Sequence, residues 1–188
     1  MTILKNITLI FALMMSAVTA SAGDPWREGE FRSTVILTLT GNIEKPTRGA
    51  SNEDIDKFFI FNDIEFANAA QFDVAALSAL PQTSVKADFP MGGPVYVFEG
   101  PLLSDVLHAA GAMGETITIR ALDGYAVDIP FEEAIAKGAV VALKRDGIPF
   151  AIGDFGPTHV VFPRADRDDL AEMNDDWWVW SIYHIHVE

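Results

Sequence analysis

Alternating hydrophobic and polar positions along the chain predict many short β-strands. Residues 34–40 (TVILTLT) are rich in β-branched side chains and stop at Gly41-Asn42, which is typical of a strand followed by a turn. Further strands are predicted at residues 83–87, 95–99, 117–121, 126–129, 140–144, 159–162 and 178–187. The aromatic segment 58–61 (FFIF) is predicted to form a buried strand or a packed loop.

The first of three short helices is predicted to begin after Asp73 and to end before Pro81. The Asp73 side chain suits the N-cap position, where a carboxylate accepts a hydrogen bond from a free backbone N–H. Phe72 and Leu77 stand at the two positions of a hydrophobic staple around the same start. This stretch of sequence therefore specifies a helix start and a helix end.

The second helix is predicted to begin at Gly100-Pro101 and to end at Gly111, and the third to cover residues 130–137 before Gly138. Between two predicted strands, residues 89–94 (FPMGGP) contain two prolines and two glycines, so they form a shaped loop. Many short strands with a few inserted helices indicate an α+β fold with a mixed or mainly antiparallel sheet.

The N-terminal residues are typical of an export signal. Lys5 precedes an apolar run at residues 7–18 that is too short to span a membrane, and Ala20 and Ala22 supply the small residues that a signal peptidase accepts. We expect cleavage after Ala22, with residues 1–22 as the signal peptide and residues 23–188 as a single periplasmic domain. An uncleaved membrane anchor is the alternative.

Composition excludes several classes of protein. The chain has 27 acidic and 13 basic residues, for a formal net charge of −14, and such a surface repels the phosphates of a nucleic acid. It contains no cysteine, which excludes disulfides, thiolate metal ligands and cysteine nucleophiles. Nearly half of the residues (49%) are hydrophobic, which is enough for a packed core.

Six segments occur in a characteristic order along the chain. They are FDVAALSALPQ (72–82), FEGPLLSDVLHAAGA (98–112), LDGYAVDIP (122–130), ALKRDGIP (142–149), GPTHVVFP (156–163) and WVWSIYHIHV (178–187). This succession resembles the molybdopterin-binding domain of the sulfite oxidase superfamily, in particular its small, exported, stand-alone members. The resemblance extends from about Gly41 to the C-terminus.

The resemblance implies an α+β fold of mixed sheets around a cleft for a pterin or molybdopterin. In catalytic members a cysteine that follows the first helix by roughly a dozen residues coordinates molybdenum. This chain has TSVKADFPM at residues 83–91, without a cysteine and without the arginine-rich sequence that follows it in those members. The resemblance therefore implies a non-catalytic pterin-binding protein, and related small proteins imply a partner among membrane signalling proteins that make or degrade cyclic di-GMP.

A pterin has a flat aromatic face and an edge of N–H donors, so its site needs aromatic plates and a carboxylate acceptor. Suitable side chains occur in the segments that carry the resemblance. The predicted pterin-site residues are Asp88, Phe89, Asp123, Tyr125, Asp154, His159, Arg164 and Trp177. Arg164 is included because a phosphate on the pterin would need a cationic partner. For several of these residues a structural role is the competing interpretation, as an Asp-Gly turn at Asp123 or as aromatic packing at Tyr125.

Two alternative functions stay open at the sequence level. One is a molybdopterin-dependent oxidoreductase with a cysteine-free metal environment. The other is a histidine-based metal binder, because strand alternation would place His184, His186 and Glu188 on one face. In that arrangement the opposite face, with Tyr183, is the buried one.

Overall fold

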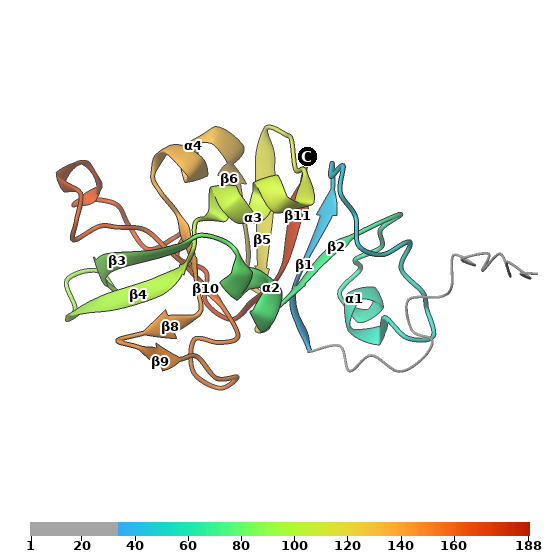
Figure 1. The fold of residues 1–188 in the computed structure, drawn as a ribbon, viewed down its shortest axis with the longest axis horizontal. Coiled ribbons are helices and arrows are strands. Elements are labelled where there is room, and N and C mark those ends of the chain that lie inside the picture. Colours follow the sequence, from blue (N-terminus) through green and yellow to red (C-terminus); the bar gives the residue numbers. More distant parts are fainter. Residues whose placement is uncertain (1–33) are drawn as a thin grey trace, which may run out of the picture. The chain divides into compact units, whose positions relative to one another are not determined.

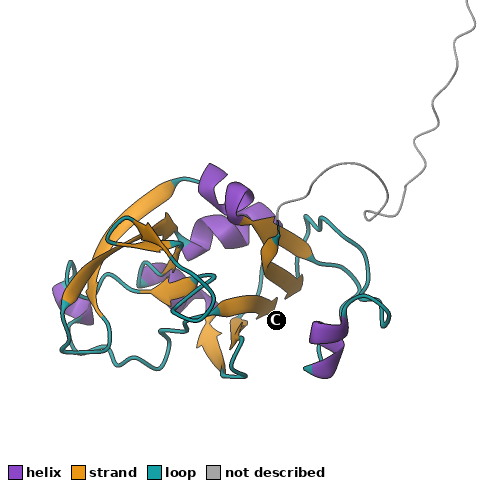
Figure 2. Ribbon diagram, turned by 90° about the horizontal axis from the view of Figure 1, so that it is seen from below, coloured by secondary structure: helices purple, strands orange, loops and turns teal. Residues whose placement is uncertain are grey.

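The computed structural model describes residues 34–188. The predicted signal peptide, residues 1–22, lies outside the described residues. Within the described part, strands form a five-stranded, a four-stranded and a two-stranded sheet, accompanied by short helices. Figure 1 shows this arrangement, and Figure 2 shows how little of the chain is helical compared with strand and loop. The predicted α+β class is confirmed.

The five-stranded sheet brings the beginning and the end of the described chain together. Its order is β2-β1-β11-β5-β6, and β1 pairs with β11 in parallel while its other pairs are antiparallel. Its strands are β1 (Val35–Gly41), β2 (Ala70–Asp73), β5 (Thr116–Ala121), β6 (Ala126–Pro130) and β11 (Ile182–Val187). In Figure 1 the blue β1 and the red β11 lie side by side.

The other two sheets are entirely antiparallel. The four-stranded sheet has the order β3-β4-β8-β9, and the two-stranded sheet pairs β10 with β7. Their strands are β3 (Gln82–Asp88), β4 (Val95–Pro101), β7 (Val140–Ala142), β8 (Lys144–Arg145), β9 (Ile148–Pro149) and β10 (His159–Val161). The predicted loop at residues 89–94 connects β3 to β4 and closes their long hairpin.

The helices are α1 (Lys57–Phe61), α2 (Val74–Ala79), α3 (Leu103–Ala110) and α4 (Phe131–Ala136), with a 3-10 turn η1 (Asp168–Leu170). The predicted N-cap of α2 is confirmed, because the Asp73 side chain accepts a hydrogen bond from the Ala76 N–H at 2.7 Å. The predicted end of α3 is also confirmed, since Gly111 adopts a left-handed conformation with φ of 63°.

Two predictions about local structure are wrong. Residues 58–61 form part of helix α1 rather than a buried strand or a packed loop, and Phe61 is 84% exposed, although Phe59 packs against a small buried cluster that includes Tyr183. Helix α3 begins at Leu103 rather than at Gly100-Pro101, because β4 continues to Pro101. A Cβ on Gly100 would lie 2.1 Å from the Val141 carbonyl oxygen, which shows how closely β4 approaches β7 there.

Two predicted strands are also shorter than expected. Residues 140–144 divide into β7 and β8 with Leu143 between them. Strand β11 begins at Ile182 rather than at Trp178, and the preceding Ser181 has a positive φ of 52° that no regular strand contains. The tryptophans before Ser181 therefore lie on an irregular segment.

The main core lies against the five-stranded sheet. Alternate residues of β5, among them Ile117 and Ile119, are fully buried, while β1 is buried over consecutive residues that include Leu37 and Leu39. Helix α3 packs its apolar residues into the same cluster. Within residues 34–188 no helix is long and apolar enough to cross a membrane.

Candidate ligand-binding site

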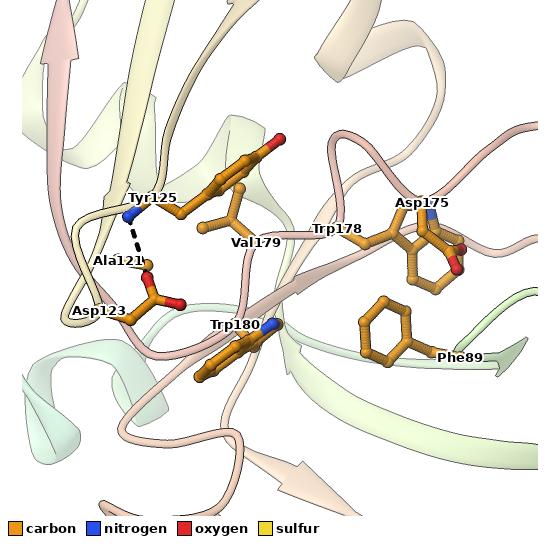
Figure 3. A pocket seen from close by; sticks show the side chains of 8 residues that line it. All are labelled: Phe89, Ala121, Asp123, Tyr125, Asp175, Trp178, Val179 and Trp180. Carbon is orange, nitrogen blue, oxygen red and sulfur yellow. Dashed lines mark hydrogen bonds between the residues drawn. The ribbon is translucent and has the colours of Figure 1, made fainter.

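A cavity of about 330 Å³ opens where the β5–β6 turn, the β3–β4 loop and the segment before β11 meet. Half of the residues that line it are aromatic. The lining residues are Phe89, Ala121, Asp123, Tyr125, Asp175, Trp178, Val179 and Trp180. Figure 3 shows the Tyr125 and Trp180 rings on opposite sides of the cavity, with the Asp123 carboxylate beside them. We call this space the aromatic cavity.

The turn between β5 and β6 positions one wall of the aromatic cavity. Asp123 Oδ1 accepts a hydrogen bond from the Tyr125 N–H at 2.9 Å, and Gly124 between them has a φ of 92° that favours glycine. The Tyr125 hydroxyl donates to the Asp176 carbonyl oxygen at 2.9 Å and so ties the turn to the loop before β11. Sequence reasoning gave Asp123 a turn role and a ligand role, and this geometry allows both.

The segment before β11 supplies the other walls. Trp178 is buried and its ring stacks on Phe89, with centroids 5.8 Å apart and planes inclined by 10°. Trp180 is 37% exposed and is therefore accessible to a ligand. The Ser181 N–H donates to the Phe155 carbonyl oxygen at 2.9 Å, which fixes the end of the segment. Trp178 thus supports the cavity, while Trp180, whose ring meets Phe155 edge-on at 6.4 Å, presents a partly exposed ring.

The two carboxylates of the aromatic cavity differ in their remaining capacity for hydrogen bonds. Asp175 accepts from Arg164 Nη1 at 2.8 Å through Oδ1 and from the Met91 N–H at 2.8 Å through Oδ2. Asp123 uses only Oδ1, so its Oδ2 has no partner among the described residues. A carboxylate oxygen accepts two hydrogen bonds, so Asp123 can receive two N–H donors from a ligand edge.

Arg164 lies behind the aromatic cavity at the centre of a hydrogen-bonded clamp. Its Nε donates to Asp88 Oδ1 at 2.6 Å, and its Nη2 donates to the Asp88 carbonyl oxygen. Its Nη1 donates to the Met173 carbonyl oxygen at 2.6 Å as well as to Asp175. The guanidinium carbon lies 4.3 Å from the centre of the Trp178 ring. Arg164, which was predicted as a cationic partner for a phosphate, is therefore a buried cation that binds groups of the protein itself.

Asp88 is held in its ionised form by the same clamp. Its partial burial by itself would raise the pKa of Asp88, but hydrogen bonds from Arg164 and from the Gly92 N–H, together with the Arg164 charge, lower it overall. Both oxygens of this carboxylate accept hydrogen bonds from the protein, and Asp88 does not line the aromatic cavity. Its observed role is to hold the β3–β4 loop.

His159 lies in an aromatic cluster next to the cavity wall rather than in the cavity. Its ring stacks on Phe155 at 5.4 Å and meets Phe89 edge-on at 4.8 Å. Burial is the largest cause that lowers the pKa of His159 to about 3; the Trp178 backbone raises this pKa in part, and the Arg145 charge lowers it. The imidazole is therefore neutral at physiological pH and behaves as an aromatic core residue.

The last two predicted site residues lie elsewhere. Asp154 is exposed in the turn after β9, where its side chain accepts a hydrogen bond from the Phe155 N–H. Trp177 lines a separate cavity of about 360 Å³, together with Lys137 and Glu172. Of the eight predicted residues, the structure brings Phe89, Asp123 and Tyr125 together in the aromatic cavity. Asp175 was not predicted, and Trp178 and Trp180, although they belong to the cluster of tryptophans in the sequence, were not included among the predicted site residues.

The histidines of β11 are arranged differently from a metal site. His184 Nε2 and His186 Nδ1 both contact the Thr40 hydroxyl, at 2.8 and 2.9 Å, so the predicted shared face exists. His184 is only 1% exposed, so both faces of β11 are covered at this point and the expected single buried face is wrong. Glu188 approaches His186 at 3.5 Å, but among residues 34–188 no group of three or more His, Cys, Asp or Glu side chains is placed to hold a metal ion.

The residues near the aromatic cavity do not fit a molybdenum centre. The sequence provides no thiolate, and a thioether such as Met91 is a weak donor. The single carboxylate in the segment 83–91 is that of Asp88, and its oxygens accept hydrogen bonds from Arg164 and from the Gly92 N–H. The donor set that the sulfite oxidase superfamily uses for molybdenum is therefore missing from this part of the chain.

Comparisons with known proteins identify the class of fold. No protein-family model matches the chain, and no curated protein matches its sequence. The structure supports a distant sulfite-oxidase-like fold, in agreement with the resemblance of the sequence. A solved structure that it matches is the sulfane dehydrogenase SoxCD from Paracoccus pantotrophus, with a TM-score of 0.55 and 15% sequence identity. The match covers 80% of this chain and 37% of that chain, and at this identity it shows the fold alone.

Proposed function

We propose that this protein binds a pterin-type planar heterocycle in the aromatic cavity and does not transform it. The observation that carries the proposal is the placement of the Tyr125 and Trp180 rings on opposite sides of the cavity, with the Asp123 carboxylate, whose Oδ2 has no partner among the described residues, beside them. A planar ring would stack against these side chains. Its N–H edge would donate to Asp123.

The chemistry of the ligand class matches these walls. Aromatic side chains contribute large apolar area and prefer offset-stacked or edge-on contact with another ring. A pterin carries an amino group beside a ring N–H, and a carboxylate can accept both in parallel. The volume of about 330 Å³ is near the lower end of the roughly 300–1,000 Å³ of typical ligand pockets, which suits one bicyclic ring.

The fold supports the pterin proposal and the donor set argues against catalysis. The distant likeness to a sulfane dehydrogenase supports a fold that the sequence resemblance connects with molybdopterin. The absence of cysteine from the sequence removes the thiolate that the resemblance implies for catalytic members of the sulfite oxidase superfamily. If the site binds a ligand without converting it, the protein can act only through the difference between its ligand-bound and ligand-free states.

Titration with 6-hydroxymethylpterin, followed by quenching of tryptophan fluorescence and by calorimetry, tests the proposal. We expect saturable binding with one ligand per chain. Trp180→Ala removes one stacking ring and is expected to weaken binding by roughly tenfold. Trp177→Ala is the matched comparison, because Trp177 lines the other cavity. Loss of binding in the Trp177 variant alone would show that the ligand binds in the other cavity. Absence of binding in the unmodified protein would reject the proposal.

We also propose that the protein works in the periplasm and reports ligand occupancy to a membrane signalling protein. The support is the sequence of residues 1–22, which is typical of an export signal, together with the resemblance to small exported proteins. Intact-mass measurement on exported protein should give a chain that begins at Gly23. A species that retains residues 1–22 in the membrane fraction would contradict this location.

A further inference from the structure

We infer that the aromatic cavity selects a pterin without a phosphate group and rejects phosphate-bearing forms such as molybdopterin. This inference rests on the proposed function, because it concerns the ligand of the same cavity. It differs from what the fold likeness alone would suggest, since molybdopterin carries a phosphate. The basis is the charge of the groups that surround the cavity.

The lining of the aromatic cavity contains two carboxylates and no cation. Asp123 and Asp175 are its charged residues, and none of the described residues that line it is a lysine or an arginine. Recognition of phosphate usually requires a cation or several N–H donors aimed at it. A phosphate in this space would instead face charges of its own sign.

Arg164, which lies behind the cavity, does not cancel the negative charge of its lining. Arg164 reaches Asp175 at the cavity wall, but its side chain is only 3% exposed and its guanidinium is shared between Asp175 and Asp88. Two carboxylates on one guanidinium leave this clamp with a net negative charge. Sequence reasoning assigned Arg164 to phosphate, and the structure shows that four of its five N–H donors are used within the protein.

The position of Asp123 explains why the cavity would favour the heterocycle itself. Its free Oδ2 faces the space between Tyr125 and Trp180, where it can accept the amino group and the ring N–H of the heterocycle. The same charge that attracts these donors repels a phosphate, because like charges a few ångströms apart interact unfavourably. One residue therefore favours the ring and disfavours its phosphate ester.

The test compares 6-hydroxymethylpterin with its phosphate monoester by calorimetry, since the two compounds share one ring. We expect the ester to bind at least about tenfold more weakly at low salt. The difference should shrink between about 10 mM and about 1 M salt, because the screening length falls from about 30 Å to about 3 Å.

Asp123→Asn identifies the residue responsible. This variant keeps an oxygen for the Tyr125 N–H and loses the charge, so we expect weaker binding of the parent pterin, by about tenfold, and a smaller penalty for the ester. Asp54→Asn is the matched control, because it removes the same charge from an exposed position outside the cavity. It should leave both affinities unchanged.

The outcomes separate the two proposals. If neither compound binds the unmodified protein, the proposed function fails. If both bind equally, or the ester binds more tightly, the proposed function stands and the inference about phosphate is overturned. A weaker ester whose penalty does not change with salt would also overturn the inference, because exclusion would then come from size rather than from charge.

Discussion

Arg164 and Asp88 form an ion pair with an Nε–Oδ1 distance of 2.6 Å, in which the Arg164 side chain is only 3% exposed. Asp88 ends β3, and the next residue, Phe89, enters the aromatic cavity. On its other side the Arg164 guanidinium stacks over Trp178, which also lines the cavity. The ion pair therefore links the stability of the domain to the shape of its candidate site.

Asp88→Asn is expected to lower the free energy of unfolding by about 1–3 kcal/mol. The substitution removes a charge that faces Arg164 and weakens the acceptor for the Gly92 N–H, while Asp175 continues to pair with the guanidinium. Urea unfolding followed by circular dichroism measures the loss. Asp169→Asn is the matched control, because it breaks an exposed pair with Arg167 and such pairs contribute little. An equal effect of the two substitutions would contradict the structural role of Asp88.

The two buried histidines should make the domain less stable as the pH falls. Burial is the largest cause that lowers the pKa of both His159 and His184 to about 3. The Arg145 charge also lowers the pKa of His159, and His186 and Arg120 also lower that of His184. In the unfolded chain a histidine has a pKa of about 6.5, so the unfolded state binds protons that the folded state does not bind between these values. The stability contributed by each neutral histidine is complete above pH 6.5 and decreases toward pH 3.

We expect each histidine to remove about 2 kcal/mol of stability between pH 7 and pH 5. His159→Phe tests this, because phenylalanine fills a similar volume among the surrounding aromatic rings and cannot be protonated. Urea unfolding at several pH values gives the free energy of unfolding as a function of pH. Between pH 7 and pH 5 this free energy should change about half as much in the variant as in the unmodified protein, and His184 accounts for the change that remains. An unchanged slope would show that His159 is not the group that titrates on unfolding.

Local sequence signals predicted the elements whose ends are chemically marked. Asp73 capped α2 and Gly111 ended α3 as expected, because one side chain or one backbone conformation decides these positions. The elements that depend on distant neighbours were not predictable. Whether Gly100 begins a helix or extends β4 is decided by β7, about forty residues later in the sequence.

The candidate site shows the same division. Asp123 and Tyr125 are adjacent in a turn with its own sequence signature, so their grouping was visible in the sequence. Asp175 and Trp180 reach the cavity only because an irregular segment ends at Ser181, whose positive φ has no marker in the sequence. Asp88 and Arg164 were predicted as pterin-site residues, but the structure shows them hydrogen-bonded to each other across 76 positions of the sequence, a contact that no local signal marks.

Gly41→Ala is expected to destabilise the domain by about 2 kcal/mol or more. Gly41 has a φ of 89°, and an added Cβ would lie 2.1 Å from the Val187 carbonyl oxygen, at the end of the parallel pair between β1 and β11. Thermal denaturation measures the effect. Gly49→Ala is the matched control, because nothing lies within 4 Å of its Cβ position. Similar melting temperatures for the two variants would show that the contact at Gly41 is not restrictive.

The protein is expected to lack sulfite oxidase and sulfoxide reductase activity even after reconstitution with molybdenum cofactor. Those reactions depend on donors that set the potential of the metal and keep a coordination position open, and a thiolate is the protein donor in the superfamily that this sequence resembles. This chain has no cysteine, and the oxygens of Asp88 are bonded to Arg164 and Gly92. Assays with a dye acceptor, on protein from cells grown with molybdate or with tungstate, measure the activity. Turnover that depends on molybdate and disappears with tungstate would show that the thiolate is dispensable, and the oxidoreductase would then replace the binding protein as the proposed function.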